Sequence, residues 1–195
     1  MKRIIGHDYT LNYLKDLYKK DILPNKILFT GKKGIGKSLL ANHLINFMYS
    51  ENNNNFSNNL INNSHPNIFR VFKNNDKKSI EISQIREMIK FQNHSSFDNK
   101  IKSIIINDLE YLNINSTNAL LKSIEEPNDK VLFILINNSE KKISSTLKSR
   151  CIEFKLSLKY KDVEFIINDY FKQNIYKNIS LDFKNYFTSP SFLIN

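Results

Sequence analysis

The chain has 195 residues, of which 41% are apolar and 25% charged. This is enough apolar material for one packed core, or a core with a small appendix, and it excludes a chain that is disordered throughout. The net charge of +10 comes from 29 cationic residues, only four of them arginines, in a chain that also carries 29 asparagines. Two explanations of the charge stay open: a polyanionic partner, or a coding bias toward Lys, Asn and Ile.

Cysteine content and apolar runs limit the compartment and the class of protein. A lone cysteine, Cys151, cannot form a disulfide within the chain, and no Cys/His group has zinc spacing. The longest apolar run, VLFILI at 131–136, is far shorter than a membrane span, and MKRIIGHDYT at the start has no signal-peptide core. We therefore expect a cytoplasmic protein that binds neither zinc nor a membrane.

The first half of the chain predicts the start of a βαβ unit. KILFT at 26–30 is typical of a buried strand, GKKGIGKS at 31–38 of a glycine-bearing loop, and 39–48 of a helix with an apolar face. The asparagine-rich stretch at 51–63 indicates a loop or an eroded insertion. IFRVF at 68–72 alternates like a strand, and a helix is expected at 83–91 with Ser83 as its cap.

The second half predicts further buried strands separated by helices. Residues 102–108 and 131–138 are β-branched or aliphatic runs, and the helical run that follows Asn113 should end at Pro127. Such runs indicate a parallel sheet with helices on both faces, and hence an α/β fold. We expect a nucleotide-binding domain over 1–154 and a small helical lid over 155–195.

Residues 31–38 carry the pattern GxxxxGKS between a predicted strand and a predicted helix. In this position the pattern indicates a phosphate-binding loop. Glycines at these positions let backbone N–H groups surround a phosphate. Lys37 is expected to reach the β- and γ-phosphates, and Ser38 to offer its hydroxyl to Mg²⁺. The predicted ligands are ATP and Mg²⁺, with the loop contributing Gly31, Gly34, Gly36, Lys37 and Ser38.

Hydrolysis needs an acidic group at the end of a neighbouring strand. The candidate strand SIIIN, at 103–107, ends in Asn107, Asp108, Leu109 and Glu110. An amide is a weaker ligand for a hard cation than a carboxylate, and neither acid need face the metal. We therefore expect nucleotide binding with weak or absent hydrolysis, and Asp108 and Glu110 as a degenerate acidic pair.

Three further residues are candidates for phosphate contacts. Asn137 and Asn138 follow the strand that begins at 131, where a side chain can sense the γ-phosphate, although both can equally be ordinary loop asparagines. Arg150 is one of only four arginines in a lysine-rich chain, which favours a need for a planar, permanently charged guanidinium. A plain surface arginine is the alternative.

These segments, in this order, resemble the AAA+ clamp-loader ATPases, and most closely the delta-prime subunits of bacterial DNA polymerase III. The resemblance runs through IIGHDYTLNYL, LPNKILFTGKKGIGKSLLA, SHPNIF, IEISQIREM, IIINDLEYLNINSTNALLKSIEEP and FILINNSEKKISSTLKSRC. The segments NALLKSIEEP and SRC are the most specific of these.

The resemblance implies an ATP-driven complex with gamma/tau-like and delta-like subunits that places a sliding clamp on primed DNA. It implies a stator role for this chain, as a subunit of the polymerase III holoenzyme with no polymerase site of its own. Ile5, Gly6 and His7 would lie near the adenine, and Arg150 would act in trans as an arginine finger. Asn138 maps to the sensor-1 position, or Asn137 if the register differs by one.

The chain also departs from that family. The four-cysteine zinc module common in it is replaced by the asparagine-rich stretch, and Asn107 stands at the acidic Walker B position. YFTSPSF near the end faintly matches an SPGR segment, with Phe192 in place of arginine. A helical collar domain is expected to be absent. The alternatives are a stand-alone P-loop ATPase of AAA+ type and an interaction module without nucleotide.

Overall fold

A computed structural model describes residues 3–50, 65–96, 101–125, 130–181, 184 and 189–194. Within them the chain folds around a five-stranded parallel sheet with the order β2-β3-β4-β1-β5. The α/β fold with a parallel sheet, predicted from the buried strand runs, is confirmed. The strands are β1 (Lys26–Thr30), β2 (Ile68–Val71), β3 (Lys102–Ile106), β4 (Val131–Asn137) and β5 (Ile152–Lys155).

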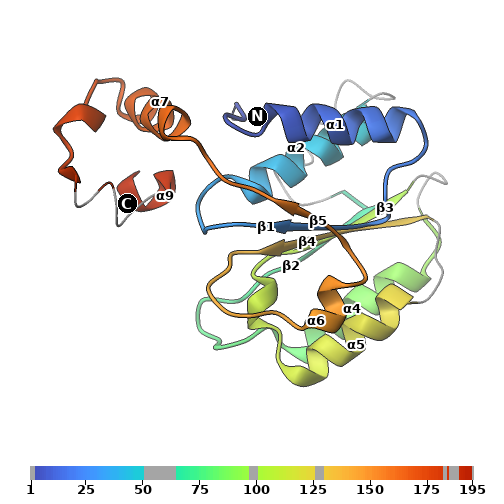
Figure 1. Ribbon diagram of the computed structural model, residues 1–195. Coiled ribbons are helices and arrows are strands. Elements are labelled where there is room, and N and C mark those ends of the chain that lie inside the picture. Colours follow the sequence, from blue (N-terminus) through green and yellow to red (C-terminus); the bar gives the residue numbers. More distant parts are fainter. Residues whose placement is uncertain are drawn as a thin grey trace.

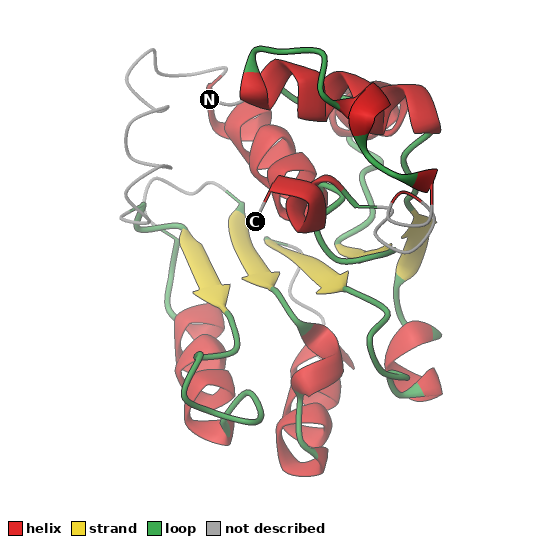
Figure 2. Cartoon of the chain, turned by 90° about the vertical axis from the view of Figure 1, so that its left-hand side faces the viewer, coloured by secondary structure: helices red, strands yellow, loops and turns green. Residues whose placement is uncertain are grey.

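Helices cover both faces of the sheet (Figures 1 and 2). One face carries α1 (Asp8–Lys19) and α2 (Lys37–Ser50), and the other carries α4 (Ile82–Asn93), α5 (Ile114–Glu125) and α6 (Ser145–Lys148). Each face has its own apolar core, one centred on α2 and the other on α4 and α5. Because the central strands β3 and β4 are buried along their whole length, continuous apolar runs mark them in the sequence.

Strand β5 was not predicted as a separate strand. It pairs only with β1, so it forms one edge of the sheet, and its exposed and half-buried residues give no apolar run. Glu153 and Lys155 place charges on this edge, which is a common protection against pairing with another chain. An edge strand of this kind has no clear signal in a single sequence.

The predicted helix ends are partly corrected. Ser83 is not the cap of α4: the helix begins at Ile82 after Glu81, whose backbone N–H donates to Gln84 Oε1 at 3.3 Å. Asn113 does cap α5, because its Oδ1 accepts a hydrogen bond of 2.8 Å from the backbone N–H of Ser116. The loop predicted at 51–63 and the helix stop at Pro127 lie outside the described residues.

After β5 the chain forms α7 (Tyr160–Phe171), the 3₁₀ turn η3 (Tyr176–Asn178) and α9 (Pro190–Ile194), all beside the sheet (Figure 1). A small separate cluster of Val163, Ile167 and Tyr176 holds this part together. The helical character expected for this region is present. The boundary between residues 154 and 155 stays a prediction.

Candidate functional site

The carboxyl ends of β1, β3 and β4 bring three polar segments to one edge of the sheet. Residues 31–38 follow β1, Asn107 and Asp108 follow β3, and Asn138 follows β4. Since β4 pairs with both β1 and β3, the segments after these three strands are neighbours in space. Ligands in open α/β sheets bind outside the carboxyl ends of the strands, which makes this edge the candidate site.

Lys37 lies at the centre of this edge, with only 3% of its surface exposed. Its Nζ donates hydrogen bonds to the carbonyl oxygens of Gly31 at 2.8 Å and Lys32 at 2.6 Å. Burial lowers the pKa of Lys37 to about 8, although the nearby carboxylates of Glu110 and Asp108 favour its charged form. The loop therefore holds a desolvated ammonium group that can turn from carbonyl oxygens to phosphate oxygens.

Ser38 and Asn107 meet directly. The hydroxyl of Ser38 donates a hydrogen bond of 2.8 Å to Asn107 Oδ1. Oxygen ligands suit Mg²⁺, and this pair supplies two neutral oxygens of that kind. The residues therefore fit a phosphate-bound Mg²⁺, with Ser38 and Asn107 facing it. The charge that an aspartate at position 107 would supply is missing.

Asp108 and Asn138 form a second pair across β3 and β4. Asn138 Nδ2 donates to Asp108 Oδ1 at 2.8 Å, and Asp108 adopts a left-handed backbone with φ of 53°. The side chain of Asn137 instead accepts a hydrogen bond from the backbone N–H of Ser139. Of the two asparagines that the sequence left open, Asn138 is thus the one that the structure brings to the acidic segment.

Glu110 lies in the 3₁₀ turn η2 (Leu109–Tyr111), beyond the end of β3 as expected. Its carboxylate accepts hydrogen bonds from the backbone N–H of Asn138 at 3.1 and 3.2 Å. Burial raises the pKa of Glu110 above its ordinary value, while these backbone hydrogen bonds oppose the shift. Glu110 therefore fixes the loop after β4 in place.

A bridge that the sequence did not predict closes the rim of the site. Glu140 forms an ion pair with Lys33 at 3.3 Å and accepts a hydrogen bond from the hydroxyl of Tyr111 at 2.5 Å. Lys141 lies over the ring of Tyr111, with 4.4 Å from Nζ to the ring centre. Lys33 belongs to the phosphate loop, so the bridge ties this loop to the segments after β3 and β4.

His7 supports the phosphate loop from the amino-terminal side. Its Nε2 lies 2.7 Å from the carbonyl oxygen of Ile35, and the ring is buried. A carbonyl oxygen only accepts hydrogen bonds, so Nε2 carries the proton. The resemblance placed Ile5 and His7 together near the adenine. The structure separates them, because His7 contacts the loop whereas Ile5 lines a cavity.

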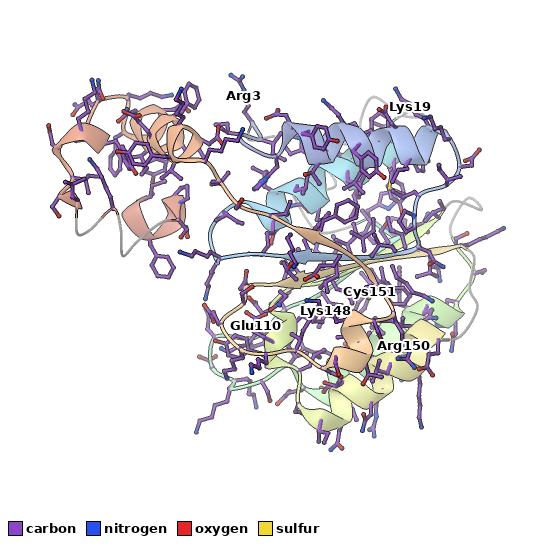
Figure 3. The ribbon with its side chains drawn as sticks, in the orientation of Figure 1. Arg3, Lys19, Glu110, Lys148, Arg150 and Cys151 are labelled. Atoms are coloured by element: carbon purple, nitrogen blue, oxygen red, sulfur yellow. The ribbon has the colours of Figure 1, made fainter. Side chains whose placement is uncertain are left out.

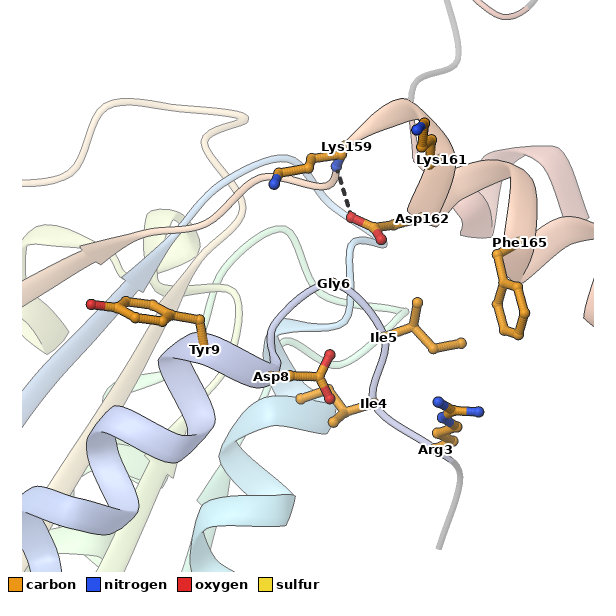
Figure 4. Close-up of a pocket in the computed structure, with 10 residues that line it drawn as sticks. All are labelled: Arg3, Ile4, Ile5, Gly6, Asp8, Tyr9, Lys159, Lys161, Asp162 and Phe165. Atoms are coloured by element: carbon orange, nitrogen blue, oxygen red, sulfur yellow. Dashed lines mark hydrogen bonds between the residues drawn. The ribbon is translucent and has the colours of Figure 1, made fainter.

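That cavity, of about 460 Å³, lies between the amino-terminal segment and α7. In Figure 4, Ile5 and Gly6 form one side of it and Asp162 and Phe165 the other. Gly6 has φ of +79°, and a Cβ on it would lie 2.5 Å from a methyl carbon of Leu158. A side chain at position 6 would therefore push the helical segment away from the cavity.

The end of the chain also contacts the phosphate loop. Gly34 has φ of +80°, and a Cβ on it would lie 1.7 Å from Oγ of Ser191. Glycine is required here for two reasons, since a side chain would strain the backbone and overlap Ser191. The segment 189–191 was thus missed as part of the site, apart from its faint SPGR-like pattern.

Arg150 lies apart from this cluster. Figure 3 shows it beside α5 and α6, whereas Glu110 lies at the carboxyl edge of the sheet. Its guanidinium forms an ion pair with Glu125 at 2.5 Å and donates to the carbonyl oxygen of Thr146 at 2.9 Å. The side chain keeps 35% of its surface exposed. Arg150 therefore contacts none of the phosphate-loop residues of its own chain in the described structure.

The segment around Arg150 is tied to the sheet. Glu153 of β5 accepts a hydrogen bond of 2.9 Å from the hydroxyl of Thr30 on β1 and pairs with Lys148 of α6 at 3.0 Å. Cys151 lies between Lys148 and Glu153 in the sequence. Burial raises the pKa of its thiol to about 11, so the thiol stays protonated at neutral pH. Arg150 is thus presented by a short, fixed segment between α6 and β5.

The described residues contain neither a metal-ligand cluster nor a membrane-spanning helix. No cluster of three or more His, Cys, Asp or Glu side chains suited to a metal ion occurs among them. None of the described helices has both the length and the apolar character needed to cross a membrane.

Comparison with known proteins decides the family. The model of the family described as "DNA polymerase III, delta subunit" matches residues 6–159, which is most of the chain. The chain belongs to this family. The expected membership in the clamp-loader AAA+ group is therefore confirmed.

Curated relatives of this delta-family chain include several polymerase III and replication factor C subunits. The delta' subunit of Pseudomonas aeruginosa is 31% identical over 90 residues, which are 46% of this chain and 27% of the relative. The gamma subunit of Buchnera aphidicola subsp. Schizaphis graminum is 26% identical over 162 residues, or 80% of this chain and 45% of the relative. The delta-family chain thus spans less than half the length of both.

Solved structures support the same fold. A DNA polymerase III gamma subunit-related protein of Thermotoga maritima has a TM-score of 0.63 at 20% identity, covering 83% of this chain and 51% of that one. The RuvB Holliday junction branch migration motor of the same species has a TM-score of 0.53 at 19% identity, covering 84% and 50%. At such identities the likeness concerns the fold alone.

Proposed function

We propose that this delta-family chain is a delta-prime-like subunit of a clamp loader that binds ATP with Mg²⁺ and offers Arg150 to a neighbouring subunit. One observation carries the proposal: the phosphate-loop cluster and Arg150 lie on separate parts of the same chain. A guanidinium that contacts none of the described phosphate-loop residues is suited to act on another molecule's phosphates. The partners are gamma/tau-like and delta-like subunits in the cytoplasm, with the sliding clamp and primed DNA reached through the complex.

The phosphate loop supports ATP binding in this proposal. Lys37 would exchange the carbonyl oxygens of Gly31 and Lys32 for phosphate oxygens, and Ser38 with Asn107 would face Mg²⁺. Bound Mg²⁺ would neutralise charge on the phosphates. The cavity beside Ile5 would take the base, with residues 155–195 acting as the lid domain over it.

Weak turnover follows from Asn107 in the same proposal. The neutral amide holds Mg²⁺ less strongly than a carboxylate does, so the chain would bind nucleotide in order to hold its shape in the assembly.

A second function, that of a stand-alone ATPase, is favoured by one contact only. Asp108 is held by Asn138 at 2.8 Å, a geometry in which its carboxylate could orient an attacking water.

Purification of the tagged full-length chain from its own cells at low salt, followed by ATPase assays, tests the proposal. The expected result is co-purification with clamp-loader subunits, and ATP turnover by the assembly that the isolated chain lacks. Strong turnover by the isolated chain, abolished by Lys37→Ala, would instead establish the stand-alone ATPase. An absence of clamp-loader subunits in the purified material would contradict the clamp-loader function.

A further inference from the structure

One buried hydroxyl beside the phosphate loop has no hydrogen-bond partner. Ser189 is only 2% exposed, and its Oγ contacts neither a donor nor an acceptor among the described residues. A hydroxyl can both donate and accept, and leaving it buried without a partner costs folding free energy. Such a group in a native fold calls for an absent ligand or a functional role.

The position of Ser189 indicates where its partner would lie. Its Oγ is 3.0 Å from the point that a Cβ on Gly34 would occupy, so it faces the middle of the phosphate loop. Ser191, two residues on, rests on the same glycine. The intervening Pro190 begins α9 and has a fixed φ, which limits how the serine backbone can move.

The loop as it stands cannot satisfy this hydroxyl. The ammonium of Lys37, in the same loop, is turned toward the carbonyl oxygens of Gly31 and Lys32, and the backbone N–H groups of a glycine-rich phosphate loop are directed at an anion. An anion bound there would bring acceptor oxygens into a region that now holds an unused O–H donor.

We propose that the hydroxyl of Ser189 donates a hydrogen bond to a phosphate of the nucleoside triphosphate bound at residues 31–38. This inference rests on the proposed function, because it needs a nucleotide in the loop. Ser189 is closed off from solvent, so the segment 189–191 must lift from Gly34 to admit the phosphates and then close over them. The end of the chain would thus carry a phosphate-binding residue.

Titration of the full-length chain with ATP and Mg²⁺, and separately with adenosine, tests this inference. Ser189→Ala should weaken ATP binding about tenfold, the usual size of a lost hydrogen bond to a charged group, and leave adenosine binding unchanged. The melting temperature of the nucleotide-free variant should be equal to or higher than that of the unaltered chain, because an unsatisfied hydroxyl has been removed.

Ser95→Ala is the control, since it removes an exposed serine hydroxyl near the amino ends of β3 and β4, away from the phosphate loop. Its ATP affinity should stay within about twofold of the unaltered chain. Unchanged ATP binding in Ser189→Ala would overturn the inference, as would an equal loss of ATP and adenosine binding, which would point to packing of the segment. No ATP binding by the unaltered chain would overturn the proposed function and this inference together.

Discussion

The phosphate-loop edge and the Arg150 segment hold their charged groups in opposite ways. At the loop, Lys37 is almost fully buried, and the hydrogen bonds Ser38–Asn107 and Asn138–Asp108 connect segments that follow different strands. Arg150 is one-third exposed, and within the described residues it pairs with Glu125, which is itself half exposed.

The difference indicates which group can be released. Breaking an exposed ion pair costs at most about 1 kcal/mol, so Arg150 can leave Glu125 for a partner at little expense. Moving a buried ammonium away from its hydrogen-bond partners costs considerably more unless a ligand replaces them. The comparison therefore favours a loop that serves this chain's own ligand and an arginine that serves another molecule.

The largest predicted effect concerns Arg150. In the assembled complex, Arg150→Ala should lower ATP turnover by about a thousandfold, because a trans-acting guanidinium stabilises transition-state charge. The same variant should keep its melting temperature and its own ATP affinity. Lys20→Ala, which removes an exposed charge from the end of α1, is the control and should leave turnover unchanged. Unaltered turnover in Arg150→Ala would remove the finger role and with it the contrast between the two regions.

The second prediction concerns Lys37. Lys37→Ala should weaken ATP binding by about a hundredfold, since it removes a charge-assisted contact to the phosphates. Lys33→Ala removes an exposed cation of the same loop and should change affinity by less than about threefold. Calorimetric titration of both variants measures the two losses. If they were equal, the general positive charge of the loop would matter rather than the buried ammonium.

The third prediction is that ATP affinity falls with rising pH while the stability of the nucleotide-free chain rises. The pKa of Lys37 is about 8, so its charge is lost between pH 7 and 9 and ATP affinity should fall about tenfold across this range. Lys37→Arg stays protonated and should show no such fall. An affinity that is flat with pH in the unaltered chain would mean that Lys37 takes no part in binding.

Stability should move the other way in the nucleotide-free chain. Between pH 8 and the ordinary lysine value of 10.5, the unfolded chain binds more protons at this residue than the folded chain. The contribution of Lys37 to the free energy of unfolding therefore rises with pH across that window, and its burial cost is present in full below pH 8. Chemical denaturation at several pH values, with Lys37→Met as reference, measures this contribution.

The smallest predicted effect concerns Asn107, which stands where a carboxylate would bind Mg²⁺. Asn107→Asp places a negative charge where Ser38 now donates its hydrogen bond, so Mg²⁺ should strengthen ATP binding several-fold more in the variant than in the unaltered chain. Titrations with and without Mg²⁺ give this ratio. Asn107→Leu, which removes the oxygen altogether, should lower it. A ratio that does not respond to either change would place the metal elsewhere.

Sequence reasoning predicted the parts of the molecule in which short segments carry their own pattern. The strands β3 and β4 are continuous apolar runs, and the phosphate loop between β1 and α2 is a contiguous motif. Their chain order alone implied a parallel sheet with the loop at its carboxyl edge. The same order placed Asp108 and Asn138 at that edge, where the structure joins them.

The features that were missed all depend on contacts between distant parts of the chain. The hydrogen bond from His7 to Ile35, the bridge from Glu140 to Lys33 and the packing of Ser191 on Gly34 join residues separated by 28 or more positions. Each of these side chains is an unremarkable polar residue in its local sequence. Only the folded arrangement gives them a partner.

The hydrogen bonds of Lys37 have a thermodynamic consequence for any nucleotide. Its ammonium already has two carbonyl acceptors, at 2.6 and 2.8 Å, so a phosphate would replace existing bonds instead of adding to them. The heat released on binding would then be smaller than the number of new contacts suggests. Gly31 and Lys32 would also need water molecules to take over their vacated carbonyl oxygens, and uptake of ordered water makes the entropy of binding less favourable.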